Sequence, residues 1–370
     1  MFSNQIIRYA FSLLMLYFLL VSCDPYKKEF KWQVESPKNL HLDTELLNKL
    51  IKKVKDSSFH AIDAILLIKD EKIVLEEYFN GYTKDSMHNT ASVGKSITSA
   101  LVGIAIQQGL IPSLETTVMD YFTDSYRIRD LNTEKKNITI YHFLTMTSGL
   151  ACDDWDEDSP GNTKHFVTAK DDFALTLNLP MVSKNGKRFA YCSGGANLLG
   201  EIIRKASGKS LKEYADTVLF NKIGVYENEW FIVPKPPHNE FAGGGNYLKP
   251  RDMAKFGLLY KNKGKWEGEQ IIPEKWIEES TSTQIEVPNE SAAYGYFWWV
   301  KEYTYKERKI PGFEASGNGG NKIIVLPKLD LVFILTGSGY GNEYIEGEQA
   351  RIIFENYILK SVNTSSTLNK

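Results

Sequence analysis

Two residues, Ser92 and Lys95, have the types and the spacing that acyl transfer requires, and no other Ser-x-x-Lys occurs in the 370-residue chain. Positions i and i+3 share one face of a helix, so the amine can lie against the hydroxyl without help from a loop. A serine hydroxyl is a poor nucleophile until a base removes its proton, and a lysine whose neutral form is favoured by burial can be that base. The pair predicts a serine nucleophile with a lysine general base. The alternative is an N-cap serine followed by a surface lysine.

The helix that must position this pair is apolar around most of its circumference. Its apolar residues are Ile97, Leu101, Val102, Ile104, Ala105 and Ile106, and Gly109 is a plausible stop. A helix that is apolar on most sides is buried. Lys95, near the start of this helix, is therefore expected to be buried rather than solvated.

Two further segments could complete the chemistry. Tyr191 and Ser193 stand directly before an apolar helix predicted over 194–206, where a tyrosine close to the lysine could relay protons. Gly317, Asn318 and Gly319 precede a predicted strand, where glycines allow a substrate to approach the backbone N–H groups that bind an oxyanion. The alternatives are a core tyrosine with a satisfied hydroxyl and a flexible hairpin turn.

In this order the three segments resemble the motifs of the serine β-lactamase and penicillin-binding-protein superfamily. The chain is most similar to the class C-like branch of esterases, D-aminopeptidases and 6-aminohexanoate-oligomer hydrolases, over roughly residues 40–360. The segments 138–150, 248–257 and 294–299 add to the likeness. The resemblance implies a β-lactamase/transpeptidase-like α+β fold, an antiparallel sheet flanked by helices with a mainly helical insertion. It also implies acyl-enzyme hydrolysis of an ester, an amide or a short peptide, without a metal or another cofactor.

The resemblance assigns a role to each motif. Ser92 is the acylated nucleophile, Lys95 its base and Tyr191 the proton relay, while N–H groups of Ser92 and of the Asn318 segment form the oxyanion hole. Candidates for the walls of the substrate pocket are Asp153, Trp155, Ser193, Trp298 and Trp299. For the tryptophans the alternative is core packing.

One departure from the family pattern bears on the substrate. The third motif is usually Lys-Thr-Gly or His-Thr-Gly, whose cation holds a β-lactam or peptide carboxylate, but Gly317-Asn318-Gly319 begins without a cation. The departure favours an esterase or amidase acting on small neutral acyl groups. A β-lactamase or D-amino-acid-specific peptidase is the alternative, and it needs a cation from elsewhere, such as Arg251 or Lys322. A third possibility is an envelope protein that binds without turnover.

Periodicity predicts that the two ends of the domain supply the sheet and that its middle is mainly helical. A helix is expected over 44–55, strands over 62–68, 72–79, 295–301, 322–327 and 331–336, and a last helix over 343–359. The domain would span residues 40–362, with its sheet part at 40–90 and 290–362 and its helical part at 91–289. Residues 363–370 would form a tail.

The N-terminus reads as an export signal. Arg8 precedes an apolar run that ends in Leu20-Val21-Ser22-Cys23, which resembles a bacterial lipobox. We expect a signal peptide over 1–22, a lipidated Cys23 and a tether over 23–39, and hence an exported protein anchored to a membrane of the cell envelope. The alternatives are an ordinary signal peptide and an uncleaved anchor.

Composition restricts the remaining possibilities. The chain has 44 basic and 46 acidic residues without a basic stripe, which argues against nucleic acid as a partner. Its six histidines are scattered and predict no metal site. Because an exported protein meets an oxidising compartment, Cys152 and Cys192 could form a disulfide; two buried free thiols are the alternative.

Overall fold

The computed structural model describes residues 30–166, 168–234, 239–306 and 308–363. The chain separates into two units, residues 1–31 and 32–370, and the second holds every helix and strand of the described residues. The expected signal peptide and Cys23 lie outside the described residues. No helix within the described ranges has both the length and the apolar character to cross a membrane.

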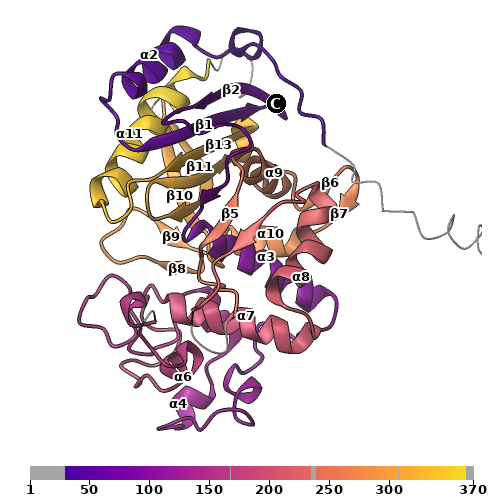
Figure 1. The fold of residues 1–370 in the computed structure, drawn as a ribbon, viewed down its shortest axis with the longest axis vertical. Coiled ribbons are helices and arrows are strands. Elements are labelled where there is room, and N and C mark those ends of the chain that lie inside the picture. Colours follow the sequence, from indigo (N-terminus) through magenta and orange to yellow (C-terminus); the bar gives the residue numbers. More distant parts are fainter. Residues whose placement is uncertain (1–29, 167, 235–238, 307, 364–370) are drawn as a thin grey trace, which may run out of the picture. The chain divides into compact units, whose positions relative to one another are not determined.

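The centre of the fold is an eight-stranded antiparallel sheet in the order β2-β1-β13-β12-β11-β10-β9-β8 (Figure 1). Its first and last segments in the sequence pair directly, because β1 lies between β2 and β13. The strands are β1 (Ile62–Lys69), β2 (Lys72–Tyr78), β8 (Ile285–Glu286), β9 (Ala293–Tyr294), β10 (Trp299–Tyr305), β11 (Arg308–Gly317), β12 (Asn321–Leu326) and β13 (Leu331–Gly337). The predicted α+β plan, with a sheet built from both ends of the domain, is confirmed.

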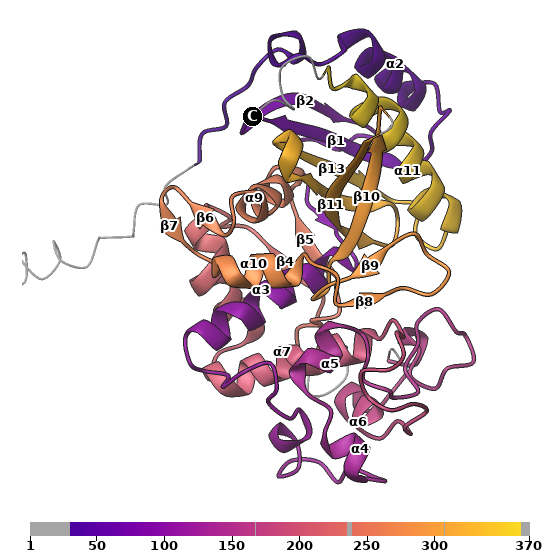
Figure 2. The ribbon, with the colours of Figure 1, turned by 180° about the vertical axis from the view of Figure 1, so that it is seen from behind.

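Helices cover both faces of this sheet. One face packs against α2 (Thr44–Lys55) and the C-terminal helical segment formed by η7 (Tyr344–Gln349), α11 (Ala350–Ile353) and η8 (Phe354–Leu359). The other face packs against α9 (Pro250–Lys261) and α3 (Val93–Gln107), the helix that Ser92 precedes (Figure 2). Since side chains alternate along a strand, Ile65 and Leu67 of β1 belong to the first layer and their neighbours face the second.

The middle of the chain supplies the remaining helices, which lie beyond α3 from the sheet (Figures 1 and 2). They are α4 (Thr133–Lys136), α5 (Ile140–Leu144), α6 (Asp172–Leu177), α7 (Ser193–Ser207) and α8 (Leu211–Ala215), with α10 (Glu274–Ser280) beside α3. Two small sheets complete the fold: β3 (His88–Asn89), β5 (Asn246–Leu248) and β4 (Glu229–Trp230), and the pair β6 (Lys265–Trp266) and β7 (Glu269–Gln270).

The structure differs from the sequence-based expectations at three places. Strand β11 was not predicted, because Pro311 and Gly312 inside it are turn signals, and β10 begins at Trp299 rather than at residue 295. Part of the expected tether belongs to the domain, since Val34 forms a parallel bridge with Ile73 and Glu35 N–H donates to the Ile73 carbonyl at 2.9 Å. The structured domain therefore begins before residue 40.

Candidate active site

Ser92 stands at the N-terminus of α3, at the end of a strained turn. Thr90 is tied to β5 by a 2.8 Å hydrogen bond from its N–H to the Asn246 carbonyl. Ala91 then adopts the left-handed conformation with φ of 48°, which costs a non-glycine residue on the order of 1 kcal/mol. The turn leaves Ser92 partly exposed, while every α3 residue from Val93 to Ala105 is buried.

Lys95 is 1% exposed, so the prediction that it is buried is confirmed. Its Nζ donates hydrogen bonds to Ser92 Oγ at 2.9 Å and to the Gly243 carbonyl at 2.6 Å. It also lies 4.8 Å from the centre of the Tyr191 ring, within the range of a cation–π contact. No carboxylate forms an ion pair with Lys95 among the described residues. The amine thus lies between the serine, a carbonyl and the tyrosine ring.

The contact with Gly243 was not predicted from the sequence. It depends on Gly94, where an added Cβ would lie 2.0 Å from Asn246 Oδ1, so that only glycine lets the 243–246 segment approach α3 this closely. The run Gly243-Gly244-Gly245 was the available signal, because consecutive glycines allow close backbone approach.

Tyr191 is brought to Lys95 from the segment that leads into α7. Its side chain is 8% exposed and forms part of an aromatic cluster. The ring is nearly parallel to those of Trp155, at 5.4 Å and 5°, and Trp299, at 6.3 Å and 16°. The Tyr294 ring makes an edge contact with the Tyr191 ring. Burial raises the pKa of the Tyr294 hydroxyl well above its usual value, and the nearby Tyr191 phenol raises it further. The structure therefore brings together Ser92, Lys95 and Tyr191.

The two tryptophans of the Trp298–Trp299 pair have different surroundings. Trp299 is partly exposed and stacks on Trp155 at 6.0 Å, so both lie beside Tyr191. Trp298 is 0% exposed and packs on Tyr260 at 4.4 Å and Phe313 at 5.2 Å. The expectation that Trp298 walls the substrate pocket is wrong, because neighbouring residues of an extended chain point to opposite sides.

Of the remaining wall candidates, Asp153 lies on the segment that faces Tyr191, and Ser193 lies two residues after Tyr191. Asp153 accepts a hydrogen bond from the Trp155 N–H at 3.1 Å and pairs with Arg188 at 3.5 Å. Burial raises the pKa of the Asp153 carboxyl, although the Trp155 N–H and Arg188 oppose that shift. Ser193 is buried at the first turn of α7. Cys152 and Cys192 are joined by a disulfide, one of the two alternatives that the sequence left open.

The end of β11 lies against the nucleophile. A Cβ added to Gly317 would lie 2.3 Å from the Thr90 carbonyl and 3.1 Å from the Ser92 nitrogen, so this glycine permits the contact. Two backbone N–H groups lie at this contact, that of Ser92 and that of Asn318, which follows Gly317. In the described part of the chain, neither donates a hydrogen bond to another protein acceptor. The Asn318 side chain instead accepts a hydrogen bond from the Gly341 N–H at 2.9 Å. The two N–H groups are the candidate oxyanion donors.

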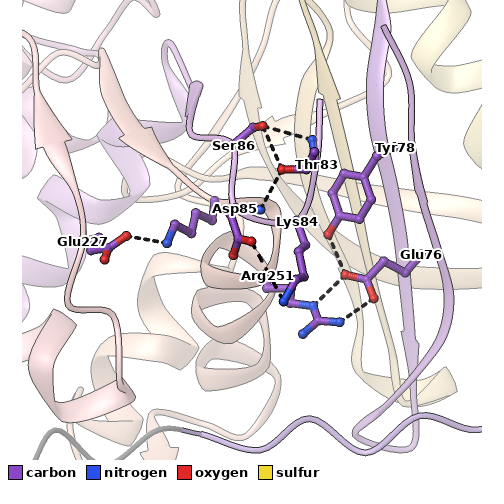
Figure 3. Close-up of polar contacts among 9 residues, drawn as sticks. Glu76, Tyr78, Thr83, Lys84, Asp85, Ser86, Glu227 and Arg251 are labelled. Atoms are coloured by element: carbon purple, nitrogen blue, oxygen red, sulfur yellow. Dashed lines mark hydrogen bonds and ion pairs between the residues drawn. The ribbon is translucent and has the colours of Figure 1, made fainter. Parts of the chain in front are cut away.

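The two cations that could have held a substrate carboxylate are engaged elsewhere. Arg251 forms a bidentate pair with Glu76 at 2.6 and 2.7 Å, within a polar network on β2 and α9 (Figure 3). Lys322 donates to Ser316 Oγ at 2.6 Å and to Glu314 at 3.3 Å. Because side chains alternate along β11, Ser316 and Glu314 point away from the face on which Gly317 meets Ser92.

The candidate site combines side chains with backbone N–H groups. Across the described ranges, no group of three or more His, Cys, Asp or Glu side chains is placed to hold a metal ion. The arrangement offers a nucleophile, a neighbouring amine, a phenol and two backbone donors.

Comparison with known proteins places this geometry in a family. Residues 47–355 match the family model described as Beta-lactamase. The chain belongs to the Beta-lactamase family. It is 25% identical over 336 residues to an uncharacterized protein of Alkalihalophilus pseudofirmus. The matched region covers 81% of this chain and 90% of that protein.

One sequence relative and one structural neighbour have named activities. The chain is 24% identical over 222 residues to the 6-aminohexanoate-dimer hydrolase of Paenarthrobacter ureafaciens, covering 58% of this chain and 56% of the relative. It shares its fold with a family VIII carboxylesterase, with a TM-score of 0.65, 17% identity and coverage of 87% and 99% of the two chains. These named relatives are hydrolases.

Proposed function

We propose that this protein is a serine hydrolase that cleaves an ester or amide bond through an acyl-enzyme on Ser92, with Lys95 as base and Tyr191 as proton relay. The observation that carries the proposal is the position of Lys95 Nζ, 2.9 Å from Ser92 Oγ and 4.8 Å from the Tyr191 ring centre. Ser92 and Lys95 lie one helical turn apart, and Tyr191 meets the buried amine of Lys95 from a distant part of the sequence.

Acylation begins with proton transfer from Ser92 Oγ to the neutral amine of Lys95, which keeps its hydrogen bond to the Gly243 carbonyl. The Ser92 oxygen bonds to the carbonyl carbon of the substrate, whose oxygen becomes an oxyanion between the N–H groups of Ser92 and Asn318. Lys95 returns the proton through the Tyr191 phenol to the leaving group, and the bond to the leaving group breaks.

Deacylation repeats these steps with water. Tyr191 and Lys95 remove a proton from a water molecule, whose oxygen attacks the acyl carbon. The tetrahedral intermediate collapses, the bond to Ser92 breaks, and the proton returns to Ser92 Oγ. Each cycle consumes one water molecule and releases an acid with an alcohol or an amine.

The surroundings of Ser92 favour a neutral acyl group over an anionic one. On β11 the two residues that precede Gly317 on the same face are Ala315 and Phe313, which carry no charge. Arg251 and Lys322 are engaged in pairs of their own. The names of the relative, a 6-aminohexanoate-dimer hydrolase, and of the structural neighbour, a carboxylesterase, agree with this substrate class. A β-lactamase or D-amino-acid-specific peptidase remains the alternative.

The protein would act in the cell envelope, anchored by lipid on Cys23. This proposal rests on the Leu-Val-Ser-Cys motif after an apolar run. Replacing Cys23 by serine should release the protein from the membrane fraction, whereas unchanged membrane association would contradict lipidation. The substrates would be small esters, amides or short peptides, and not nucleic acid.

The full-length chain in detergent, and its Ser92→Ala variant, should be assayed with p-nitrophenyl acetate and with the cephalosporin nitrocefin. We expect ester turnover that the variant loses, together with negligible nitrocefin turnover. Fast nitrocefin hydrolysis would favour the β-lactamase alternative. Ester turnover and fluorophosphonate labelling that persist in Ser92→Ala would remove Ser92 from the mechanism.

A further inference from the structure

Tyr191 has no support from regular secondary structure. It lies after the 150–188 segment and two residues before α7, which begins at Ser193. Yet a group that transfers protons must be held firmly, since a displacement of about 1 Å can cost on the order of 100-fold in rate. Something other than a helix or a strand must fix this tyrosine.

The short segment Cys152–Trp155 contacts Tyr191 and its two successors. The Asp154 N–H donates to the Tyr191 carbonyl at 2.7 Å, and the Ser193 N–H donates to Asp154 Oδ2 at 3.0 Å. A disulfide joins Cys152 to Cys192, the residue between these two contacts. The backbone that leads into α7 is therefore held by a disulfide at Cys192 and by a hydrogen bond at each of its two neighbours, Tyr191 and Ser193.

Asp154 is itself fixed by the loop around it. Its second carboxylate oxygen, Oδ1, accepts from the Thr163 N–H at 3.0 Å, and its carbonyl accepts from Asn162 Nδ2 at 3.0 Å. All four polar groups of Asp154 are thus hydrogen-bonded within the protein. This carboxylate is a structural link rather than a free charge.

Trp155 acts on the side chain of Tyr191 instead of its backbone. The two rings lie 5.4 Å apart and within 5° of parallel. Trp155 is 55% exposed, whereas the tyrosine beneath it is only 8% exposed. The indole therefore shields the phenol ring from solvent on one side, while Lys95 contacts that ring at 4.8 Å.

We propose that Cys152, Asp154, Trp155 and Cys192 are positioning residues that hold the Tyr191 phenol for proton transfer to the leaving group. The disulfide and Asp154 fix the backbone, and Trp155 fixes the plane of the ring. This inference rests on the proposed Ser-Lys-Tyr mechanism and adds to it the residues on which the relay depends.

Esters with different leaving groups distinguish a positioning role from a merely structural one. A merely structural role would lower kcat/KM equally for both esters. Phenoxide leaves poorly without a proton, whereas p-nitrophenoxide leaves readily, so a misplaced Tyr191 should slow phenyl butyrate more than p-nitrophenyl butyrate. The full-length protein is compared with Asp154→Ala, Trp155→Ala and the Cys152→Ala/Cys192→Ala pair. We expect kcat/KM for phenyl butyrate to fall about tenfold or more beyond the loss for the nitrophenyl ester.

Matched variants separate positioning from loss of the fold. Asp158→Ala removes an exposed carboxylate from the same loop, whose side chain makes no contact with 191–193, and should leave both rates unchanged. Asp154→Asn can accept from only one of the two N–H donors and should give an intermediate loss. If Asp154→Ala does not fold, Asp154→Asn and Trp155→Ala carry the same comparison.

A double-mutant cycle completes the experiment. If Asp154 acts through Tyr191, adding Asp154→Ala to Tyr191→Phe should cost little further on phenyl butyrate. Additive losses, equal losses on both esters, or no loss would each overturn the positioning proposal while turnover remained dependent on Ser92. Turnover that did not depend on Ser92 would instead overturn the proposed function, and this inference with it.

Discussion

Lys95 Nζ lies 2.6 Å from the carbonyl oxygen of Gly243, closer than its 2.9 Å distance from Ser92 Oγ. A carbonyl can only accept, so this bond always uses one proton of the amine. In a neutral Lys95 amine, this hydrogen bond fixes the direction of one N–H group. The nitrogen lone pair is then free to face the Ser92 hydroxyl. The Gly243 carbonyl thus orients the proposed base.

Replacing Lys95 should block acylation because no other amine contacts Ser92 among the described residues. Lys95→Ala should slow acylation about 100- to 10,000-fold. Lys95→Arg should be as slow, since a guanidinium stays protonated and cannot accept the serine proton. The rate of fluorophosphonate labelling measures this step, and near-normal labelling of either variant would point to another base.

Gly317→Ala should distort the site by steric overlap, without removing any polar group. The new Cβ would lie 2.3 Å from the Thr90 carbonyl, and overpacking of this kind costs about 1–3 kcal/mol. We expect lower ester turnover and a lower free energy of unfolding. Gly347→Ala is the matched control, because a Cβ there meets no atom within 4 Å. A Gly317→Ala variant as active as Gly347→Ala would mean that β11 does not press on the nucleophile.

His88 should make stability fall in mild acid. Burial lowers the pKa of His88 to about 4, so the unfolded chain takes up its proton at a higher pH than the folded protein does. The full contribution is present above about pH 6.5 and is lost as the pH falls toward 4, a change of about 3 kcal/mol.

The neighbours of His88 matter for this measurement. Asp63 Oδ2 lies 4.0 Å from the imidazole, and Tyr82 stacks on the ring at 4.4 Å. Burial raises the pKa of Asp63, which acts in the opposite direction as the pH falls. Urea unfolding at pH 7, 5.5 and 4.5 should therefore be compared with His88→Phe, which keeps a ring against Tyr82. Parallel pH profiles for the two proteins would contradict the assignment to His88.

Glu314 should contribute to stability and not to chemistry. Its carboxylate accepts from Lys301 at 2.8 Å, Lys322 at 3.3 Å and the Tyr303 hydroxyl at 2.7 Å. Burial opposes ionisation, but the two lysines outweigh it and hold the pKa of Glu314 below its usual range. Because that pKa is lowered, the stabilisation is present at neutral pH and is lost only as the pH falls through the folded-state pKa.

Glu314→Gln leaves buried Lys322 without its counter-charge, which should cost about 3–5 kcal/mol in unfolding free energy. Glu348→Gln, at an exposed pair with Arg351, should lower the unfolding free energy much less, because solvent screens that pair. Activity per folded molecule should change little in either variant. A selective loss of ester turnover in Glu314→Gln would instead place Lys322 in the substrate site.

The sequence by itself determined the features that depend on short spacing. Ser92 and Lys95 meet because three residues span one turn of helix, and a helix that is apolar on most sides had to bury the lysine. The sheet built from both ends of the domain was also foreseen, because β1, β2, β12 and β13 carry continuous β-branched and apolar runs.

Only the tertiary structure decided which distant groups complete the site. The Gly243 carbonyl reaches Lys95 across 148 positions of sequence, through a close approach that Gly94 permits. Strand β11, hidden from the sequence by Pro311 and Gly312, brings Gly317 to Ser92, and chain direction at Trp298 and Trp299 sends one indole to the core and the other to Tyr191. Such contacts depend on how segments far apart in the sequence come together, and local secondary-structure propensity does not encode this.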